Sequence, residues 1–169
     1  SYPATRDQLE QGLPENIRKH YPDCEVVAGT STAGIAHAAL VANILGLPMC
    51  YVRSSAKDHG RNNQIEGKVE KGQKVVVVED LISTGGSVIE VVNVLREAGA
   101  QVLGIASIFT YGLQKGIDRM NDAQVKNVSL SNYGALVEVA LEQNYIQPDD
   151  VKKLQAFRQN PSDAGWMNL

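Results

Sequence analysis

The 169-residue chain is poor in cysteine and aromatic residues and has no excess of positive charge. Its net charge of -3 gives no reason to expect a surface for nucleic acid or membranes, so basic residues that matter must act locally. No apolar run approaches the ~20 residues needed to cross a bilayer. The two cysteines, Cys24 and Cys50, each lie near an apolar segment. We expect free buried thiols, which would suit a reducing cytoplasm.

Apolar segments with strand character alternate along the chain with segments of helical spacing. This alternation predicts an α/β fold with a central, mainly parallel sheet flanked by helices on both faces, and ligands bound beyond the carboxyl ends of the strands. The length suits one domain, residues 1–169. The expected strands span residues 25–29, 49–53, 75–78, 102–109 and 125–130. The expected helices span residues 2–20, which Pro14 should bend or split, 33–45, 88–98, 114–122, 133–144 and 148–159, and an irregular tail follows.

The most informative segment covers residues 75–87 and reads VVVVEDLISTGGS. Its four valines indicate a strand buried on both faces. The acids that follow, Glu79 and Asp80, can accept hydrogen bonds from vicinal ribose hydroxyls or help to hold a divalent cation. Gly85 and Gly86 then let backbone N–H groups form a cradle at a helix start, where a phosphate dianion is favoured. The segment therefore predicts a site for a ribose phosphate.

Other interpretations of this segment are weaker. It is not a Walker A loop, because no Gly-Lys-Ser/Thr follows, and it does not match G-x-G-x-x-G. A purely structural alternative is a strand-to-helix turn in which Ser87 caps the helix and Glu90 completes a capping box. That alternative is compatible with binding, but it does not account for Glu79 and Asp80 at the end of a buried strand.

A second polar segment, residues 51–67, reads YVRSSAKDHGRNNQIEG and gathers Arg53, Lys57, His59 and Arg61. Lys, Arg and protonated His can stabilise negative charge on a leaving group such as pyrophosphate. A glycine-containing polar loop can also open for substrate and close to exclude water. The alternative is a solvated, charged surface loop, which its position one strand before the ribose-phosphate segment makes the weaker interpretation.

A third segment, residues 27–35, reads VAGTSTAGI and lies between an expected strand and an expected helix. Its small residues and hydroxyls would let backbone groups face a pyrophosphate. A tight turn packed on the core is the alternative explanation, and the sequence leaves both open.

These segments carry a resemblance to a known family. Residues 75–87 resemble the phosphoribosyl-pyrophosphate signature of type I phosphoribosyltransferases. The run from Arg53 to Gly60, R-x-x-A-K-D-H-G, resembles the mobile catalytic loop of orotate phosphoribosyltransferases, and residues 27–35 resemble the family's pyrophosphate loop. The resemblance implies the type I phosphoribosyltransferase fold. It also implies the Mg²⁺-dependent conversion of orotate and phosphoribosyl pyrophosphate to orotidine 5′-monophosphate and pyrophosphate in pyrimidine synthesis, by a homodimer with shared active sites.

The resemblance also implies roles for individual residues. Lys57, His59 and Asp80 are the expected catalytic residues, and Glu79 and Asp80 could help to hold Mg²⁺, most of whose contacts come from the substrate. The residues expected to bind phosphoribosyl pyrophosphate are Thr30, Ser31, Arg53, Lys57, His59, Glu79, Asp80, Leu81, Ile82, Ser83, Thr84, Gly85, Gly86 and Ser87. Where some members have a Lys, this chain has Ser54 and Ala33, so no role is transferred to those two positions.

Recognition of the base is less well specified. Ser83 matches a family position that touches orotate, whereas Phe109, Thr110 and Tyr111 occupy a region where some members place an Arg on orotate. We also expect the family's N-terminal segment, part of the hood over the base, to be missing before Ser1. Two alternatives remain: a phosphoribosyltransferase for another base, or a regulator of the same fold that senses phosphoribosyl pyrophosphate. The Lys57 and His59 loop argues against the regulator, because a sensor has no leaving group to stabilise.

Overall fold

The computed structural model describes residues 2–54 and 64–168, and in that part the predicted α/β alternation is confirmed. Its strands are β1 (Val26–Thr30), β2 (Met49–Val52), β3 (Ile65–Glu66), β4 (Lys74–Ile82), β5 (Gln101–Thr110) and β6 (Asn127–Asn132). Its helices are α1 (Pro3–His20), α2 (Ala33–Leu45), α3 (Gly86–Glu97), α4 (Gln114–Asp122), α5 (Tyr133–Glu142), α6 (Pro148–Gln159) and the 3-10 helix η2 (Ala164–Asn168). None of the helices in these ranges is long and apolar enough to cross a membrane.

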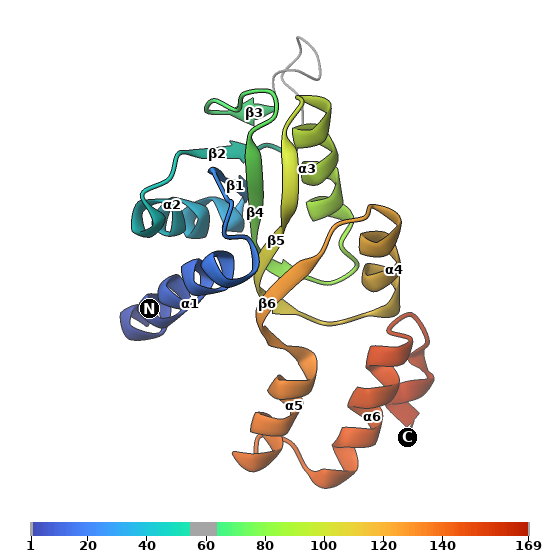
Figure 1. The fold of residues 1–169 in the computed structure, drawn as a ribbon. Coiled ribbons are helices and arrows are strands. Elements are labelled where there is room, and N and C mark those ends of the chain that lie inside the picture. Colours follow the sequence, from blue (N-terminus) through green and yellow to red (C-terminus); the bar gives the residue numbers. More distant parts are fainter. Residues whose placement is uncertain (1, 55–63, 169) are drawn as a thin grey trace.

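The described strands form one six-stranded sheet in the order β3-β2-β1-β4-β5-β6. All neighbouring strands run parallel except β2 and β3, which are antiparallel. Helices α1 and α2 lie on one side of the sheet and α3 and α4 on the other (Figure 1). The predicted fold class, a mainly parallel sheet flanked by helices, is therefore confirmed.

The four valines of β4 explain why the sheet is buried on both faces. Val75 and Val77 pack into the core beneath α3, with Leu95 among their neighbours. Val76 and Val78 point the other way and pack into the core beneath α1 and α2. All four side chains are fully buried, as expected when successive residues of a strand alternate between two covered faces.

Several local predictions differ from the structure. Pro14 lies inside one uninterrupted helix, α1, so it does not split the helix. Ser87 is not the N-cap of α3; the cap is Gly85, at a left-handed φ of 73°, and no side chain accepts a hydrogen bond there. Strand β4 continues to Ile82 beyond the valines, because β5 pairs with it as far as Thr110. The tail contains the 3-10 turn η2, and the two-residue strand β3 was not predicted.

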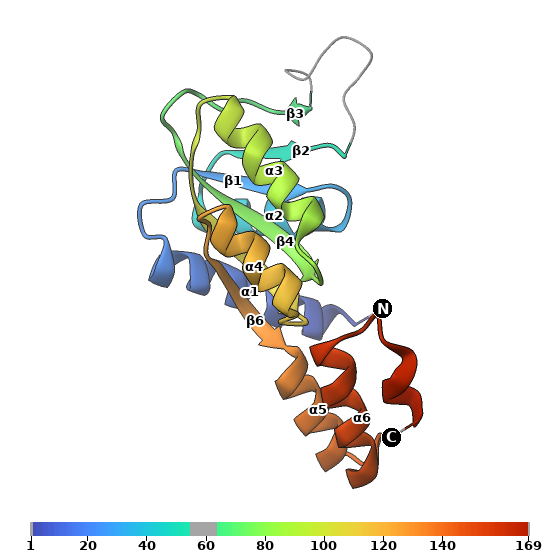
Figure 2. The same cartoon turned by 90° about the vertical axis from the view of Figure 1, so that its right-hand side faces the viewer.

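The last two α-helices, α5 and α6, lie side by side beyond the carboxyl end of β6 and project from the sheet (Figure 2). A row of aromatic rings joins them to β5: Phe109 contacts Tyr111, Tyr111 contacts Tyr133, Tyr133 contacts Phe157, and Phe157 contacts Trp166, with centroid separations of 5.3–6.1 Å. Helix α6 begins with a capping box in which the Asp150 carboxylate accepts a hydrogen bond from the Gln147 N–H. The aromatic row therefore fixes the helix pair to the carboxyl edge of the sheet.

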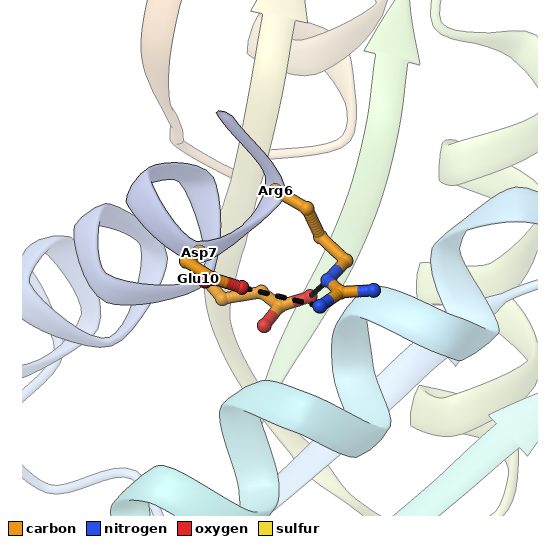
Figure 3. A network of polar contacts seen from close by, with 3 residues as sticks. All are labelled: Arg6, Asp7 and Glu10. Atoms are coloured by element: carbon orange, nitrogen blue, oxygen red, sulfur yellow. Dashed lines mark hydrogen bonds and ion pairs between the residues drawn. The ribbon is translucent and has the colours of Figure 1, made fainter. Parts of the chain in front are cut away.

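A small polar network lies at the start of α1. Arg6 contacts Asp7 and Glu10, each at 3.2 Å, as Figure 3 shows. The Arg6 side chain is 58% exposed whereas that of Glu10 is 10% exposed. The pair therefore serves mainly to neutralise the buried carboxylate of Glu10, since an exposed i,i+4 pair adds only about 0.3–0.5 kcal/mol of stability.

Helix α2 approaches the sheet closely at Gly34. An added Cβ there would overlap the Thr30 hydroxyl and lie 2.6 Å from the Val78 carbonyl oxygen. We predict that Gly34→Ala lowers the free energy of unfolding by about 1–3 kcal/mol, because neither the backbone oxygen nor the hydroxyl can move freely. Urea unfolding followed by circular dichroism measures the change.

Gly12→Ala in α1 is the matched control for this prediction. Its Cβ would come within 3.0 Å of only a flexible methyl group of Leu130, and alanine favours a helix over glycine by about 1 kcal/mol. The control should be nearly as stable as the wild type. Equal stability of Gly34→Ala and the wild type would contradict the close approach of α2.

Candidate functional site

The strands β1 and β4 lie side by side in the sheet, but the chain leaves them in opposite directions. After β1 it returns through α2 to β2, on one side, and after β4 it returns through α3 to β5, on the other. Such a switch point opens a crevice beyond the carboxyl ends of the two strands, where ligands of α/β proteins bind. The end of β1 carries Thr30 and Ser31, and the end of β4 carries Glu79 and Asp80.

A buried hydrogen bond links the two strands at this crevice. The Thr30 hydroxyl donates to Glu79 Oε1 over 2.6 Å, and the Asp80 backbone N–H donates to the same oxygen over 3.0 Å. Thr30 is 2% exposed and Glu79 is 5% exposed, while Asp80 is half-buried. The carboxylates predicted to bind ribose therefore lie at the edge of the sheet beside the loop after β1.

The environment of Glu79 favours its protonated form. Burial raises the pKa of Glu79 to about 7, and the neighbouring Asp80 side chain adds to the rise, while the hydrogen bond from Thr30 acts in the opposite direction. Near neutral pH the group therefore stands close to the midpoint of its titration. A cation or a ribose hydroxyl donor would draw it toward the carboxylate.

The loop between β4 and α3 forms the predicted cradle. Gly85 takes the left-handed conformation and is buried, and α3 starts at the next residue, Gly86. The first-turn N–H groups of a helix have no intrahelical acceptor, so the start of α3 can bind an anion. The hydroxyl-bearing residues beside it, Ser83 and Ser87, are exposed, which leaves them accessible to a ligand.

Arg119 of α4 reaches this loop, although the sequence contained no sign of it. Its Nη1 donates to the Thr84 carbonyl oxygen over 3.0 Å and lies 3.2 Å from the Thr84 hydroxyl. An added Cβ on Gly86 would lie 3.1 Å from the same nitrogen. Thr84 and Arg119 are 35 positions apart, so no local spacing pattern could have linked Arg119 to the cradle.

Three segments that are separate in the sequence meet at a small cavity of about 40 Å³. Thr30 and Ser31 line it from the end of β1, Arg53 from the end of β2, and Ser87 from α3. The Ser31 hydroxyl donates to the Val52 carbonyl oxygen over 2.6 Å, and the Ser31–Thr32 peptide bond is cis. Four of the residues predicted to bind phosphoribosyl pyrophosphate are thus brought together.

The loop after β2 is represented only by its ends. Arg53 forms an ion pair with Glu66 at 3.5 Å, and its backbone N–H donates to the Gln64 carbonyl oxygen. Lys57 and His59 lie outside the described residues. The antiparallel pairing of β2 with β3 shows that the two ends of this loop lie side by side. Strand β3 forms one edge of the sheet, and β2 lies between β3 and β1.

The region expected to recognise the base lies at the end of β5. Thr110 and Gly112 line a cavity of about 630 Å³ together with Ile82 and Ser83, and this cavity extends alongside α4 to Asn127. Most of its lining comes from α4 and the segment that follows α4, and only Ile82 and Ser83 come from the end of β4 and the loop that leads to the cradle. Leu81 is 44% exposed at the same edge.

Glu79 and Asp80 suit a hard, oxygen-binding cation such as Mg²⁺. Their carboxylates lie next to each other at the crevice, and Glu79 Oε1 already accepts two hydrogen bonds. Within residues 2–54 and 64–168 no group of three or more His, Cys, Asp or Glu side chains could enclose a metal. The two carboxyl groups could therefore supply part of the oxygen coordination of such an ion.

Comparison with known proteins identifies the family. Residues 7–144 match the model of the phosphoribosyl transferase domain. An orotate phosphoribosyltransferase of Bacillus cereus is 60% identical over 167 residues, which cover 99% of this chain and 80% of that protein. One from Bacillus cytotoxicus is 59% identical over the same shares.

Solved structures agree with the sequence matches. The orotate phosphoribosyltransferase of Aeropyrum pernix superposes with a TM-score of 0.73 at 28% identity, over 86% of this chain and 80% of that one. The UMP synthase of Leishmania donovani superposes with a TM-score of 0.77 at 25% identity, over 93% of this chain and 33% of that one. Because the family model, the high sequence identity and the fold all agree, the chain belongs to the phosphoribosyltransferase family and, within it, to the orotate phosphoribosyltransferases.

Proposed function

We propose that this chain joins orotate to the ribose 5-phosphate unit of phosphoribosyl pyrophosphate and releases pyrophosphate. A bond forms between a ring nitrogen of orotate and the anomeric carbon of the ribose, the bond from that carbon to pyrophosphate breaks, and the proton of the ring nitrogen passes to pyrophosphate or solvent. The observation that carries the proposal is the position of the Glu79–Asp80 pair just before the glycine cradle. The pair lies at the crevice where the chain leaves the paired strands β1 and β4 in opposite directions. A ribose and its 5′-phosphate fit these two neighbouring features.

Different groups of residues bind different parts of the substrate. In this proposal the backbone of residues 81–86, with the hydroxyls of Thr84 and Ser87, binds the 5′-phosphate at the start of α3. Glu79 and Asp80 accept hydrogen bonds from the ribose hydroxyls. Thr30 and Ser31, at the end of β1, face the pyrophosphate. Ser83 contacts the base.

The leaving group requires positive charge, because pyrophosphate gains negative charge as the anomeric carbon becomes oxocarbenium-like. Arg53, Lys57 and His59 supply that charge in this proposal. Arg53 would exchange Glu66 for pyrophosphate, since its guanidinium contacts that carboxylate in the present structure. Mg²⁺, held mainly by the substrate and assisted by Glu79 and Asp80, would further neutralise the phosphate oxygens when bound.

The proposal includes the setting of the enzyme. We infer one phosphoribosyltransferase domain over residues 1–169 and a homodimer in which each Lys57 loop serves the partner's site. We also infer a cytoplasmic location, which the free cysteines Cys24 and Cys50 support, because thiols remain reduced there. Burial raises the pKa of the Cys50 thiol to about 11, so this thiol is unreactive at neutral pH.

The base preference can be tested directly. Purified protein is supplied with phosphoribosyl pyrophosphate, Mg²⁺ and one of orotate, uracil, adenine, guanine or hypoxanthine, and pyrophosphate release is measured. We expect release to depend on orotate and to fall at least about 100-fold in Asp80→Asn. Asp122→Asn, on α4, is the control and should retain activity. Faster release with another base would overturn the proposal.

Shared active sites predict complementation between inactive variants. Lys57→Ala should lower kcat far more than it raises KM, because its contact strengthens as charge develops on pyrophosphate. Dimers mixed from Lys57→Ala and Asp80→Ala chains should recover activity, since one of their two sites contains both residues. Lys68→Ala is the control, because Lys68 is exposed and pairs with Glu70. A loss confined to KM, or no recovery in demonstrably mixed dimers, would contradict the assignment.

The raised pKa of Glu79 predicts proton release on binding. The free protein holds a proton on Glu79 below about pH 7, whereas Mg²⁺ and ribose hydroxyls bind the carboxylate. The affinity for Mg²⁺ and phosphoribosyl pyrophosphate should therefore fall below pH 7, by up to about tenfold per pH unit through this group. Calorimetric titration from pH 6 to 8.5 measures it. Glu79→Gln should lack this component, so parallel pH profiles of the two proteins would exclude Glu79 as its source.

A further inference from the structure

Two arginines link α3 and α4, one from each helix, and each bonds a backbone carbonyl at an end of the other helix. Arg119 of α4 donates from Nη1 to the Thr84 carbonyl oxygen, at the start of α3. Arg96 of α3 donates from Nη1 to the Ala123 carbonyl oxygen over 2.7 Å and from Nη2 to the Gln124 carbonyl oxygen over 3.2 Å, just after α4. The Arg96 contact places a cation at the negative end of a helix dipole, which is favourable.

The Arg119 contact has the opposite electrostatic character. It places a guanidinium against Gly86, the first residue of α3, where the helix dipole is already positive. The position of Arg119 in the last turn of α4 is favourable for a cation, but within residues 2–54 and 64–168 Arg119 forms no ion pair with a carboxylate that would neutralise its charge beside the start of α3. A cation held next to a positive helix end is stabilised when an anion binds there. The arrangement therefore points to a negatively charged ligand.

The hydrogen bonds of Arg119 also orient two donors of the cradle. In a planar trans peptide the C=O and the following N–H point in opposite directions. By fixing the Thr84 carbonyl, Arg119 turns the Gly85 N–H away from α4. The Thr84 hydroxyl lies 3.2 Å from the same nitrogen and can act only as the acceptor in that contact, because a guanidinium donates only. Its own proton is thus left for a ligand.

We propose that Arg119 is a positioning residue for the 5′-phosphate: it holds Thr84 so that the Gly85 N–H and the Thr84 O–H face the phosphate, and its charge adds to that of the α3 N-terminus. The proposal rests on the proposed function, since it assumes that the cradle binds the phosphate monoester of the substrate. It adds a residue from a different element, α4, that acts mainly through Thr84.

The test compares two product-like ligands. Kd values for ribose 5-phosphate and for pyrophosphate, the latter with Mg²⁺, are measured by calorimetry for the wild type, Arg119→Gln and Arg119→Lys. We expect Arg119→Gln to weaken ribose 5-phosphate binding about 10–100-fold, as for loss of hydrogen bonds that involve charge, and to change pyrophosphate binding less than about twofold. Arg119→Lys keeps the charge and a donor nitrogen, so its affinity for ribose 5-phosphate should fall less. In turnover, KM for phosphoribosyl pyrophosphate should rise more than kcat falls.

Arg96→Gln is the matched control. It removes a guanidinium that also bonds backbone carbonyls between α3 and α4, but away from the cradle. It should lower the unfolding temperature as Arg119→Gln does and leave the ribose 5-phosphate Kd unchanged. A similar loss of ribose 5-phosphate affinity in both variants would show that Arg119 acts only through stability, and would overturn the proposal.

A double-mutant cycle tests the route of the effect. If Arg119 acts through Thr84, then Thr84→Val and Arg119→Gln together should weaken ribose 5-phosphate binding by less than the product of their separate effects. An unchanged Kd in Arg119→Gln would refute the inference while leaving turnover of orotate by the wild type intact. Independent effects in the cycle would refute the part assigned to the Thr84 hydroxyl, because Thr84→Val keeps the backbone carbonyl. Absence of both turnover and ribose 5-phosphate binding in the wild type would instead refute the proposed function and the inference with it.

Discussion

The hydrogen bond from the Thr30 hydroxyl to the Glu79 carboxyl group is the contact on which the site depends. It joins β1 to β4 where the two strands end, and it satisfies a carboxyl group that is almost completely buried. A buried carboxyl group without a partner would be costly, so the pair needs both strands in register. The pairing of Ala28 with Val77 and of Gly29 with Val78 sets that register. Gly34 allows α2 to pack against the same point.

The site combines two electrostatic environments a few residues apart. At the strand end, Glu79 and Asp80 place two carboxyl groups, which suit the hydroxyl groups and the cation of the proposed function. After the turn, Gly85, the start of α3 and Arg119 present positive potential to a phosphate. A substrate with neutral hydroxyls next to a dianion fits this division. The raised pKa of Glu79 follows from the burial that holds the strands together, so the stability of the fold and the acid-base state of the site share one cause.

Burial of Glu79 also makes ligand-free stability depend on pH. Its pKa is about 7 in the folded chain and ordinarily 4.5, so the folded chain binds the proton more tightly. The resulting stabilisation is fully present below about pH 4.5 and is lost as the pH rises to 7. Above pH 7 the chain folds around a buried carboxylate, which lowers the free energy of unfolding.

The local sequence pattern was enough to predict most helices and strands. The predictions failed where tertiary contacts decide the backbone conformation. The bounds of α2, α4 and α6 match the predictions, because helical spacing and flanking Gly or Pro are encoded locally. The prediction that Ser87 caps α3 was wrong, because Gly85 adopts a positive φ that lets α4 pack on the loop. A Cβ added to Gly85 would lie 3.6 Å from Met120 of α4. Pro14 stays inside α1 because that helix is held by its buried face, including Leu13 and Ile17.

The sequence by itself determined the chemistry of the site: the acids, glycines and hydroxyls of residues 79–87 are contiguous, so their spacing could be interpreted without a structure. The sequence could not determine which distant side chains meet them. Thr30 reaches Glu79, 49 residues away in sequence, only because β1 lies next to β4 in the sheet order β1-β4-β5. Arg119 reaches Thr84, 35 residues away, only because α4 packs against the loop before α3. Such contacts depend on the closing of long loops around a common core, which no local pattern encodes.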